Sequence, residues 1–219
     1  MSALFIYCAG GFGKEVMDVA IRFNAANQRW TSIFFLDDFC ETSTRYDTKV
    51  FKFDKACEWL QKNEGMVIIA TGEPSARAML RSKLEGKGVT LDTLIDTTTV
   101  VADSARIESG VVITAFCSVS SDAVIQLNAS VNTMSIVGHD VLVGENTVIS
   151  SMVNIGGETK IGRNSYIGMG ALIKEGVTIG NDVIIGMGSV VYNDIPDNMI
   201  ALGNPARPMR SNDNKKVFR

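Results

Sequence analysis

Residues 137–167 read VGHDVLVGENTVISSMVNIGGETKIGRNSYI, and an isoleucine or valine stands at every sixth position of this stretch. Extended in both directions, the same spacing gives seventeen positions from Ile95 to Val191, and all of them hold isoleucine or valine. Four residues after each one the chain has a small or β-branched side chain, from Thr99 to Ile195. No insertion or deletion interrupts this register, which predicts a repeat structure.

A period of six suits a triangular solenoid, in which each short strand contributes one large inward aliphatic side chain and three strands close a coil. Such coils stack about 4.8 Å apart, the spacing of hydrogen-bonded strands. The segment is long enough for roughly five to six coils of parallel β-helix. Glycine often follows the aliphatic residue directly, and we expect these glycines at tight corners that tolerate little else. They are Gly138, Gly144, Gly156, Gly162, Gly168, Gly180 and Gly186.

The first 90 residues alternate between short apolar runs and helical patterns. The apolar runs predict buried strands, and the amphipathic stretches between them predict helices. The strands are expected at residues 3–8, 32–36 and 66–71, and the helices at 14–26, 54–62 and 75–85. Alternating strands and helices imply a parallel sheet with covering helices. We therefore expect an α/β Rossmann-like domain over residues 1–90 and a parallel β-helix domain with a C-terminal tail over residues 91–219.

The composition excludes several classes of function. A formal net charge of −3 provides no basic field that would attract nucleic acid or anionic lipid. No run approaches the roughly 18 apolar residues of a membrane span, and no basic segment precedes the first strand, so we expect a cytoplasmic protein. The cysteines have no CxxC spacing, which predicts neither a disulfide framework nor a zinc cluster. They are Cys8, Cys40, Cys57 and Cys117.

Several segments together carry a resemblance to a known family. They are AGGFGKEV (9–16), FLDD (35–38), IATGEPSAR (69–77), VNTMSIVGHD (131–140) and GNPAR (203–207). With the hexapeptide repeat, they are similar to the sialic acid O-acetyltransferase-like family of sugar acetyltransferases, whose bacterial members N-acetylate nucleotide-linked 4-amino sugars. The resemblance implies that the β-helix is left-handed, that acetyl-CoA is the co-substrate, and that the protein is a homotrimer with active sites between subunits.

His139 is the only histidine of the chain and the strongest candidate for catalysis. It stands two residues after Val137, at an expected corner of the solenoid, next to Asp140 and seven residues after Asn132. Acyl transfer requires the attacking amine or hydroxyl to lose a proton, and a histidine with a near-neutral pKa suits that task. The resemblance implies that His139 is the catalytic base. It also implies that Asn132 and Asp140 orient the imidazole or the acceptor.

The resemblance further implies where the acetyl donor binds. The amide of Gly157, in the coil after the base, would hold the oxyanion of the tetrahedral intermediate. The pantetheine chain would follow main-chain groups near Gly157, Ala171 and Ser189, while Lys174 and residues 203–207 would approach the phosphates. One departure is Val148, at a position where many relatives carry a second histidine that contacts the donor.

The glycine-rich turn of the first domain predicts a phosphate site. Gly10, Gly11, Phe12 and Gly13 follow a predicted strand and open a helix, the context in which backbone amides bind a pyrophosphate. Asp37 and Asp38 end the second strand, where a Rossmann unit places its ribose-binding acid. About 90 residues make only half a dinucleotide fold, which favours a nucleotide-linked sugar over NAD. Alternatively, the glycines form a structural turn and the acids cap the next segment.

The sequence thus predicts an acetyl-CoA-dependent N-acetyltransferase that acts on the 4-amino group of a UDP- or dTDP-linked amino-deoxy sugar for bacterial surface glycan synthesis. Two alternatives remain, O-acetylation of a sialic acid or related sugar and a non-catalytic β-helix scaffold. A zinc-dependent β-helix carbonic anhydrase would need three histidines, and the chain has one. No metal site is therefore expected.

Overall fold

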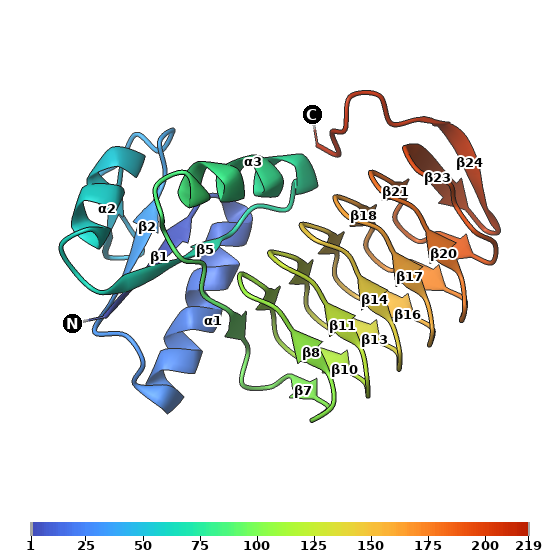
Figure 1. Cartoon of the computed structure of the whole chain (residues 1–219), viewed down its shortest axis with the longest axis horizontal. Coiled ribbons are helices and arrows are strands. Elements are labelled where there is room, and N and C mark those ends of the chain that lie inside the picture. Colours follow the sequence, from blue (N-terminus) through green and yellow to red (C-terminus); the bar gives the residue numbers. More distant parts are fainter. Residues whose placement is uncertain (1, 219) are drawn as a thin grey trace.

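The computed structural model describes residues 2–218 and contains an α/β unit followed by a long solenoid (Figure 1). The elements of the α/β unit are β1 (Ala3–Tyr7), α1 (Gly11–Asn27), β2 (Ser32–Leu36), β3 (Thr44–Arg45), β4 (Thr48–Phe51), α2 (Phe53–Leu60), β5 (Gly65–Ile69) and α3 (Pro74–Glu85). The first solenoid strand begins at Leu94. A domain boundary at residue 90 stays a prediction.

The α/β unit is a five-stranded sheet with the order β3-β4-β2-β1-β5. Its strands pair in parallel except for β3 and β4, which form an antiparallel hairpin. Helix α1 packs on one face of the sheet, and α2 and α3 pack on the other. The chain reverses its direction across the sheet between β1 and β5. Their carboxyl ends therefore form the topological switch point, the place where open α/β sheets bind ligands.

Two local features of this unit differ from the sequence-based expectations. Helix α1 begins at Gly11 rather than at residue 14, so the predicted glycine turn is largely the first turn of the helix. The hairpin of β3 and β4 was not expected. Its turn residues Tyr46 and Asp47 have φ values of 52° and 54°, the conformation of a tight hairpin turn, although neither is glycine or asparagine. The sequence therefore lacks the glycine or asparagine that normally identifies such a turn.

The solenoid consists of short strands followed by a C-terminal hairpin. The solenoid strands are β6 (Leu94–Ile95), β7 (Val100–Val101), β8 (Arg106–Ile107), β9 (Val112–Ile113), β10 (Ser118–Val119), β11 (Val124–Ile125), β12 (Ser130–Val131), β13 (Ile136–Val137), β14 (Leu142–Val143), β15 (Val148–Ile149), β16 (Asn154–Ile155), β17 (Lys160–Ile161), β18 (Tyr166–Ile167), β19 (Leu172–Ile173), β20 (Thr178–Ile179), β21 (Ile184–Ile185) and β22 (Val190–Val191). The hairpin is formed by β23 (Met199–Gly203) and β24 (Ala206–Ser211).

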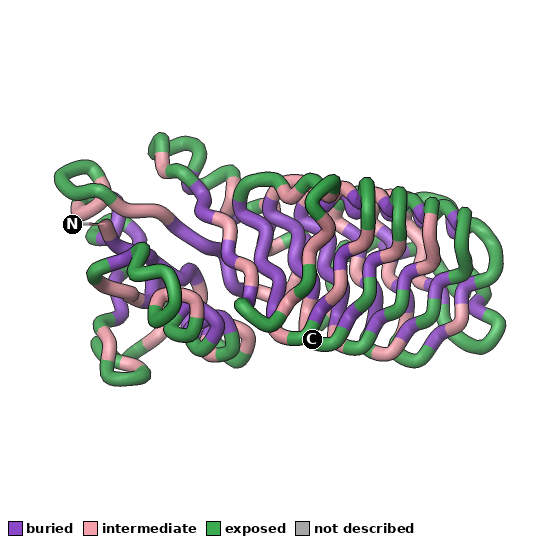
Figure 2. Tube along the Cα trace, turned by 90° about the horizontal axis from the view of Figure 1, so that it is seen from below, coloured by how far each residue is buried: buried purple, intermediate pink, exposed green. Residues whose placement is uncertain are grey.

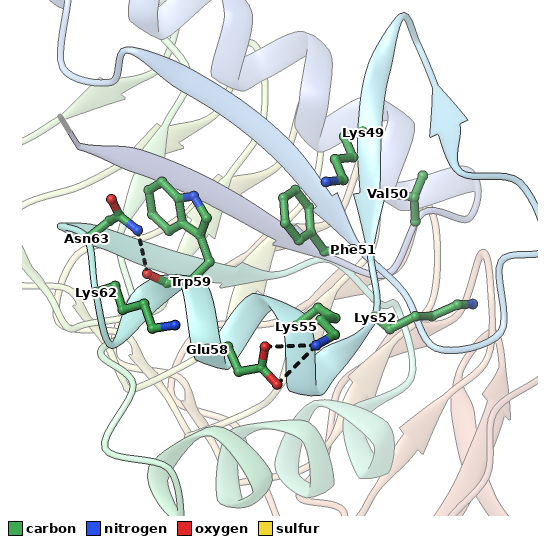
Figure 3. Close-up of a pocket in the computed structure, with 9 residues that line it drawn as sticks. All are labelled: Lys49, Val50, Phe51, Lys52, Lys55, Glu58, Trp59, Lys62 and Asn63. Carbon is green, nitrogen blue, oxygen red and sulfur yellow. Dashed lines mark hydrogen bonds and ion pairs between the residues drawn. The ribbon is translucent and has the colours of Figure 1, made fainter.

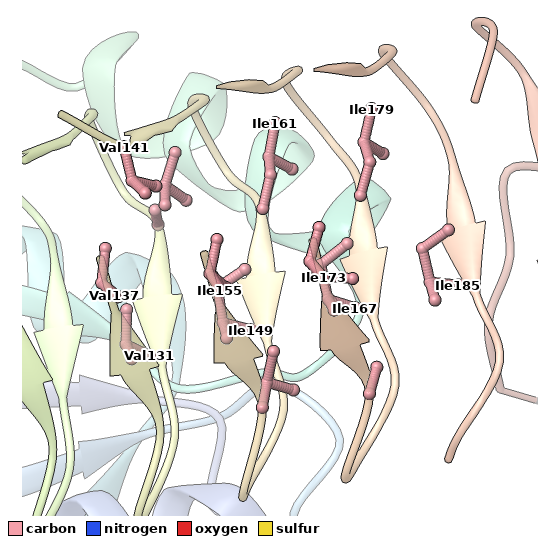
Figure 4. Close-up of a cluster of buried hydrophobic side chains, with 14 of the residues drawn as sticks. Val131, Val137, Val141, Ile149, Ile155, Ile161, Ile167, Ile173, Ile179 and Ile185 are labelled. Atoms are coloured by element: carbon pink, nitrogen blue, oxygen red, sulfur yellow. The ribbon is translucent and has the colours of Figure 1, made fainter. Parts of the chain in front are cut away.

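Each periodic aliphatic residue is the second residue of one of these two-residue strands, which confirms the predicted repeat. Every third strand pairs in parallel, as β13 does with β16 and β16 with β19, so the strands form three flat faces. From Ile113 onward the aliphatic side chains are buried and stack in columns inside the prism (Figure 4). Buried positions recur in stripes between exposed corners along the whole solenoid (Figure 2).

The seven predicted corner glycines are used for close approach rather than for a special backbone conformation. None of them has a positive φ. The left-handed residue comes two positions later, as at Asp140 with φ 57° and Asn146 with φ 57°. A Cβ placed on Gly144 would lie 2.5 Å from the carbonyl carbon of Gly162 in the next coil. The expectation of glycine at the corners was correct, but its physical reason is the stacking of one coil on the next.

A buried arginine joins the α/β unit to the solenoid. Arg77 of α3 is fully buried, and burial lowers the pKa of its guanidinium to about 9. It donates to the carbonyl oxygens of Ile69 and Thr71 on one side and of Asn128 and Ala129 on the other, and also to the Asn128 side chain. Arg77 therefore fixes the position of α3 on one corner of the solenoid.

We expect Ile161→Ala to lower the free energy of unfolding by about 2–5 kcal/mol, because it opens a cavity in the stacked core. Lys160 precedes Ile161 in β17 and points outward. Lys160→Ala is therefore the matched control, with an expected change within about 0.5 kcal/mol. Denaturant unfolding measures both changes. Equal effects of the two substitutions would contradict the inward orientation of Ile161.

Candidate active site

His139 and Asp140 form a hydrogen-bonded pair at a corner of the solenoid. Both residues lie in the turn between β13 and β14. Asp140 occupies the left-handed position of the turn, which aspartate tolerates better than most residues. From there its Oδ2 lies 2.8 Å from Nδ1 of His139. Both side chains are more than half exposed, so the pair is accessible to a ligand.

The carboxylate of Asp140 sets the protonation behaviour of the imidazole. The hydrogen bond that His139 donates to Asp140, together with the negative charges of Asp140 and Glu158, raises the pKa of His139 above its ordinary value. In the neutral ring, the proton on Nδ1 is donated to Asp140, so the lone pair is on Nε2. The pair therefore offers one proton-accepting nitrogen of increased basicity.

Gly157 lies directly beneath this nitrogen, one coil further along the chain. A Cβ on Gly157 would collide with Nε2, Cε1 and Cδ2 of His139, so only glycine leaves room for the ring. The amide of Glu158 donates to the carbonyl oxygen of His139 at 2.8 Å, which fastens the two corners together. Within residues 2–218, the amide of Gly157 donates to no protein group. The structure thus brings the predicted base and the predicted oxyanion donor together.

A groove continues from this corner over the next coils. It has a volume of about 350 Å³ and is lined by Asn154, Gly156, Leu172, Ile173, Lys174, Val190 and Tyr192. Lys174 lies in it, in agreement with its predicted location on the later coils. Sequence reasoning missed Leu172 and Tyr192, which are 47% and 53% exposed. Their only signal in the sequence is a large apolar side chain at an outward position.

Ala171 and Ser189 do not line this groove. Both are buried, and their main-chain groups are already bonded within the solenoid. The carbonyl oxygen of Ala171 accepts from Asn154, and that of Ser189 accepts from Leu172. The hydroxyl of Ser189 accepts from the amide of Gly203, the last residue of β23 and the first of the predicted 203–207 segment. A ligand could contact either residue through its main chain only as a second donor to a carbonyl oxygen that already accepts one bond.

Asn132 and Val148 lie elsewhere on the solenoid. Asn132 follows β12, at the corner that precedes β13, so one side of the triangle separates it from His139. Its Oδ1 is buried and has no hydrogen-bond partner among the described residues. Val148 is completely buried in β15, where it pairs in register with Ser130 and Tyr166. Within one chain, therefore, Asn132 does not contact His139, and Val148 is not accessible.

The glycine-rich segment divides into open and packed positions. Side-chain positions at Gly10 and Gly11 have nothing within 4 Å, so this end of α1 faces open space. A Cβ on Gly13 would collide with the carbonyl oxygen of Cys8, which explains the need for glycine where α1 packs against β1. The side chain of Phe12 packs on the core beneath α1, so it offers a ligand mainly its backbone. The free amides at the start of α1 can bind an anion.

Asp37 and Asp38 both line a cavity of about 440 Å³ at the carboxyl ends of β1 and β2. Asp37 is occupied by the backbone, because its carboxylate accepts from the amides of Ala9, Phe39 and Cys40. This agrees with the alternative in which the acid caps the next segment. Sequence reasoning missed the rest of the lining, which is Tyr7, Cys8, Phe39, Ala76, Met79, Leu80 and Lys83.

Asp38 is held in place by charged and neutral donors. It accepts from the amide of Phe53 at 2.8 Å and from Nζ of Lys83 at 2.9 Å. Partial burial alone would raise the pKa of Asp38, but these hydrogen bonds outweigh burial and lower it below its ordinary value. Asp38 is therefore an anion at neutral pH, with Lys83 as a counter-ion that a ligand could share.

A separate hollow of about 390 Å³ lies on the α/β unit between β4 and α2 (Figure 3). Four lysines line it, but Lys55 is paired with Glu58, and Lys52 donates to main-chain carbonyls. None of the predicted site residues is among its lining.

No cluster of three or more His, Cys, Asp and Glu side chains that could hold a metal ion occurs in residues 2–218. No helix in this part of the chain is long and apolar enough to cross a membrane.

Comparisons with known proteins agree with both halves of the chain. Residues 3–84 match the family described as the PglD N-terminal domain, and residues 158–193 match the bacterial transferase hexapeptide family of six repeats. No curated protein matches the chain.

Solved structures resemble the chain over almost its full length. The acetyltransferase domain of PglB from Neisseria gonorrhoeae FA1090, in complex with acetyl coenzyme A, is 32% identical, with 94% of this chain and 98% of that chain covered and a TM-score of 0.87. The chain belongs to the left-handed β-helix sugar acetyltransferases. PerB from Caulobacter crescentus, in complex with CoA and GDP-perosamine, is 28% identical, with coverages of 95% and 97% and a TM-score of 0.86. WeeI from Acinetobacter baumannii AYE is also 28% identical, with coverages of 95% and 100% and a TM-score of 0.84. The predicted fold class and enzyme class of this acetyltransferase are thereby confirmed.

Because the acetyltransferase has one histidine, its imidazole C–H signals are unambiguous in a proton NMR titration. We expect a pKa above 6.5, because the Asp140 carboxylate stabilises the imidazolium. Asp140→Asn removes that charge and should lower the pKa. An unchanged pKa in Asp140→Asn would contradict the pairing in solution.

Proposed function

We propose that this acetyltransferase transfers the acetyl group of acetyl-CoA to the 4-amino group of a nucleotide-linked amino-deoxy sugar, with UDP or dTDP as the nucleotide, for the synthesis of a bacterial surface glycan. The observation that carries the proposal is the meeting of Nε2 of His139 with Gly157 beside the groove that contains Lys174. The acetyl coenzyme A bound by PglB and the GDP-perosamine bound by PerB support it. The backbone of residues 10–13 and the carboxylate of Asp38 would bind the nucleotide portion, while Asp37 would hold the loop after β2 in place.

In this mechanism the amine attacks the thioester directly, within a ternary complex. The nitrogen forms a bond to the acetyl carbonyl carbon, and Nε2 of His139 accepts the proton that the nitrogen loses. The amide of Gly157 donates to the oxyanion of the tetrahedral intermediate. The intermediate then collapses with cleavage of the C–S bond, and the imidazolium returns the proton to the sulfur of CoA. Asp140 keeps Nδ1 protonated throughout.

The cysteines support transfer without an acyl-enzyme. All four are free thiols, and burial raises the pKa of Cys8, Cys57 and Cys117, which makes them poor nucleophiles. A hydrogen bond with Thr42 lowers the pKa of Cys40, but this residue lies on the α/β unit rather than beside His139. Free thiols are also typical of a reducing compartment, which supports action in the cytoplasm.

A row of exposed apolar side chains supports assembly into a homotrimer. The row follows one corner of the solenoid through successive coils, and each side chain is more than half exposed. It consists of Phe116, Met134, Met152, Met169 and Met187. Contiguous apolar surface of this kind marks an interface in a protein of this size. A second copy of the chain would cover this apolar row, and the copies would be related by a three-fold axis parallel to the solenoid.

Such an axis would also give Asn132 a role. Asn132 and His139 belong to the same coil, at neighbouring corners, and the apolar row runs along the corner of Asn132. A three-fold axis parallel to the solenoid keeps equivalent coils level. Asn132, which is half-buried at this corner, would then lie at the interface that faces His139 of the partner subunit. Active sites would then lie between subunits.

The alternative acceptor is a hydroxyl group of a sialic acid or related sugar, which the same base could deprotonate. Membership of the acetyltransferase family and the paired base favour catalysis over a scaffold role. The two acceptors differ in whether a nucleotide is needed. The open start of α1 and the cavity at Asp38 favour the nucleotide-linked substrate.

The decisive assay offers acetyl-CoA with UDP-, dTDP- or GDP-linked 4-amino sugars, or with free sialic acid, and measures CoA release and acetylated product. We expect product only from a nucleotide-linked amino sugar. His139→Ala should reduce kcat by about 10²–10⁴-fold, the usual contribution of a general base. Ser121→Ala, at the equivalent corner of the preceding coil, should remain active. Product from sialic acid alone would overturn the proposal.

The pH dependence should report the same base. The imidazole must be neutral to accept a proton, so kcat/KM should rise with pH through the raised pKa of His139. Asp140→Asn should move this acid limb to lower pH. A flat profile from about pH 5 to 9 would be inconsistent with a histidine base.

Sedimentation or light scattering should give a mass three times the 23.7 kDa of one chain. Met152→Glu introduces a charge into the apolar row and should yield monomers with little activity, because Asn132 no longer meets a partner. Met209→Glu is the matched control, since Met209 is 62% exposed on β24 and Met152 is 60% exposed. A monomeric wild-type protein would exclude the shared active site.

A further inference from the structure

The C-terminal tail returns from the far end of the solenoid to the α/β unit (Figure 1). It leaves β24 at Ser211 and is tethered to the solenoid by Asn212 and Lys215, which bond to the carbonyl oxygen and the carboxylate of Asp182. It then reaches the start of α3. The amides of Val217 and Phe218 donate to the carboxylate of Glu73 at 3.0–3.1 Å.

The point of contact is the expected ligand-binding edge of the sheet. Gly72 and Glu73 follow β5, and the glycine-rich segment at Gly10 follows β1. The carboxyl ends of these two strands form the switch point. The ring of Phe218 packs against Gly72. A Cβ placed on Gly72 would lie 3.5 Å from Cε2 of this ring. An aromatic ring from the tail thus stands at the edge of the nucleotide site.

The same ring also touches the solenoid. Phe218 meets Tyr166 edge to face, with ring centroids 5.6 Å apart. Tyr166 belongs to the solenoid face that carries Val148. Phe218 is still 50% exposed, although it makes contacts on two sides. Half of the Phe218 side chain is therefore left available to a ligand.

We propose that Phe218 forms an apolar wall for the sugar ring of the acceptor, and that Glu73 is a positioning residue that holds it there. This inference rests on the proposed function. A deoxy sugar presents an apolar face and a methyl group, for which an aromatic ring is a suitable partner. The ring lies between the carboxyl ends of β1 and β5 and the solenoid face that carries Tyr166, so a sugar held at the glycine-rich segment would lie beside it. The base would come from the partner subunit, as in the proposed shared active site.

The test compares KM, kcat and nucleotide affinity in matched variants of the full chain. Phe218→Ala should raise KM for the nucleotide-linked amino sugar about ten-fold, a loss of roughly 1.4 kcal/mol in binding. The KM for acetyl-CoA, the kcat at saturation, and the calorimetric Kd of the free nucleoside diphosphate should stay within two-fold. Phe218→Tyr should restore the wild-type KM. Ile21→Ala is the control, because it removes a 51% exposed apolar side chain from the exposed side of α1.

A double-mutant cycle tests the part assigned to Glu73. Glu73→Ala releases the two tail amides and should raise the same KM, and Glu73→Gln, which keeps an acceptor oxygen, should restore it. The double variant Glu73→Ala/Phe218→Ala should be no worse than Phe218→Ala alone, because Glu73 acts through the ring. Additive losses would overturn the positioning role.

Failure of the inference and failure of the proposed function give different results. Wild-type protein that acetylates sialic acid but no nucleotide-linked amino sugar would overturn both. Wild-type protein that acetylates a nucleotide-linked amino sugar, with an unchanged KM in Phe218→Ala, would overturn the inference alone. An equal loss of affinity for the free nucleoside diphosphate would also overturn it, because the ring would then contact the nucleotide instead of the sugar.

Discussion

Hydrogen bonds between successive coils are the constraint on which the rest of this structure depends. They set Val137 against Ile155 and Ile155 against Ile173, so residues one coil apart in the sequence are neighbours in space. His139 therefore lies over Gly157 without any dedicated contact to bring them together. The rigidity of the active-site corner comes from the regular backbone around it, since the side chains involved are largely exposed.

The sequence predicted those parts of the molecule that follow from periodicity. The inward aliphatic residues and the corner of His139 derive from one uninterrupted register, whereas the pairing of Gly157 with the base came from the family resemblance. Whether a main-chain group remains free does not follow from it. Ala171 and Ser189 have the expected positions in the repeat, but both are buried and their amides and carbonyl oxygens already take part in hydrogen bonds of the solenoid. The return of the tail to Glu73 was also not predictable, because Val217 and Phe218 belong to no repeat.

The α/β unit illustrates a different limit. A carboxylate at the end of a strand can bind a ligand or cap backbone amides, and both uses select aspartate at the same place in the sequence. Asp37 is saturated by three amides, while Asp38 shares its charge between an amide and Lys83. Which of the two carboxylates remains available to a ligand depends on the conformation of the loop after β2 and on the position of α3. Helix α3 is distant from both aspartates in the sequence. The resemblance to known acetyltransferases could therefore indicate the pair but could not separate its members.

Arg77 has a consequence for how the whole chain unfolds. Its guanidinium is enclosed between the two halves, and all its partners are carbonyl oxygens of β5, the loop after it and one solenoid corner. Pulling the halves apart would break the hydrogen bonds that Arg77 donates to Asn128 and Ala129 and would expose the surface packed around them. Neither half can therefore detach as an intact body at low cost. Although its two architectures look independent, the chain is built to melt in one cooperative step.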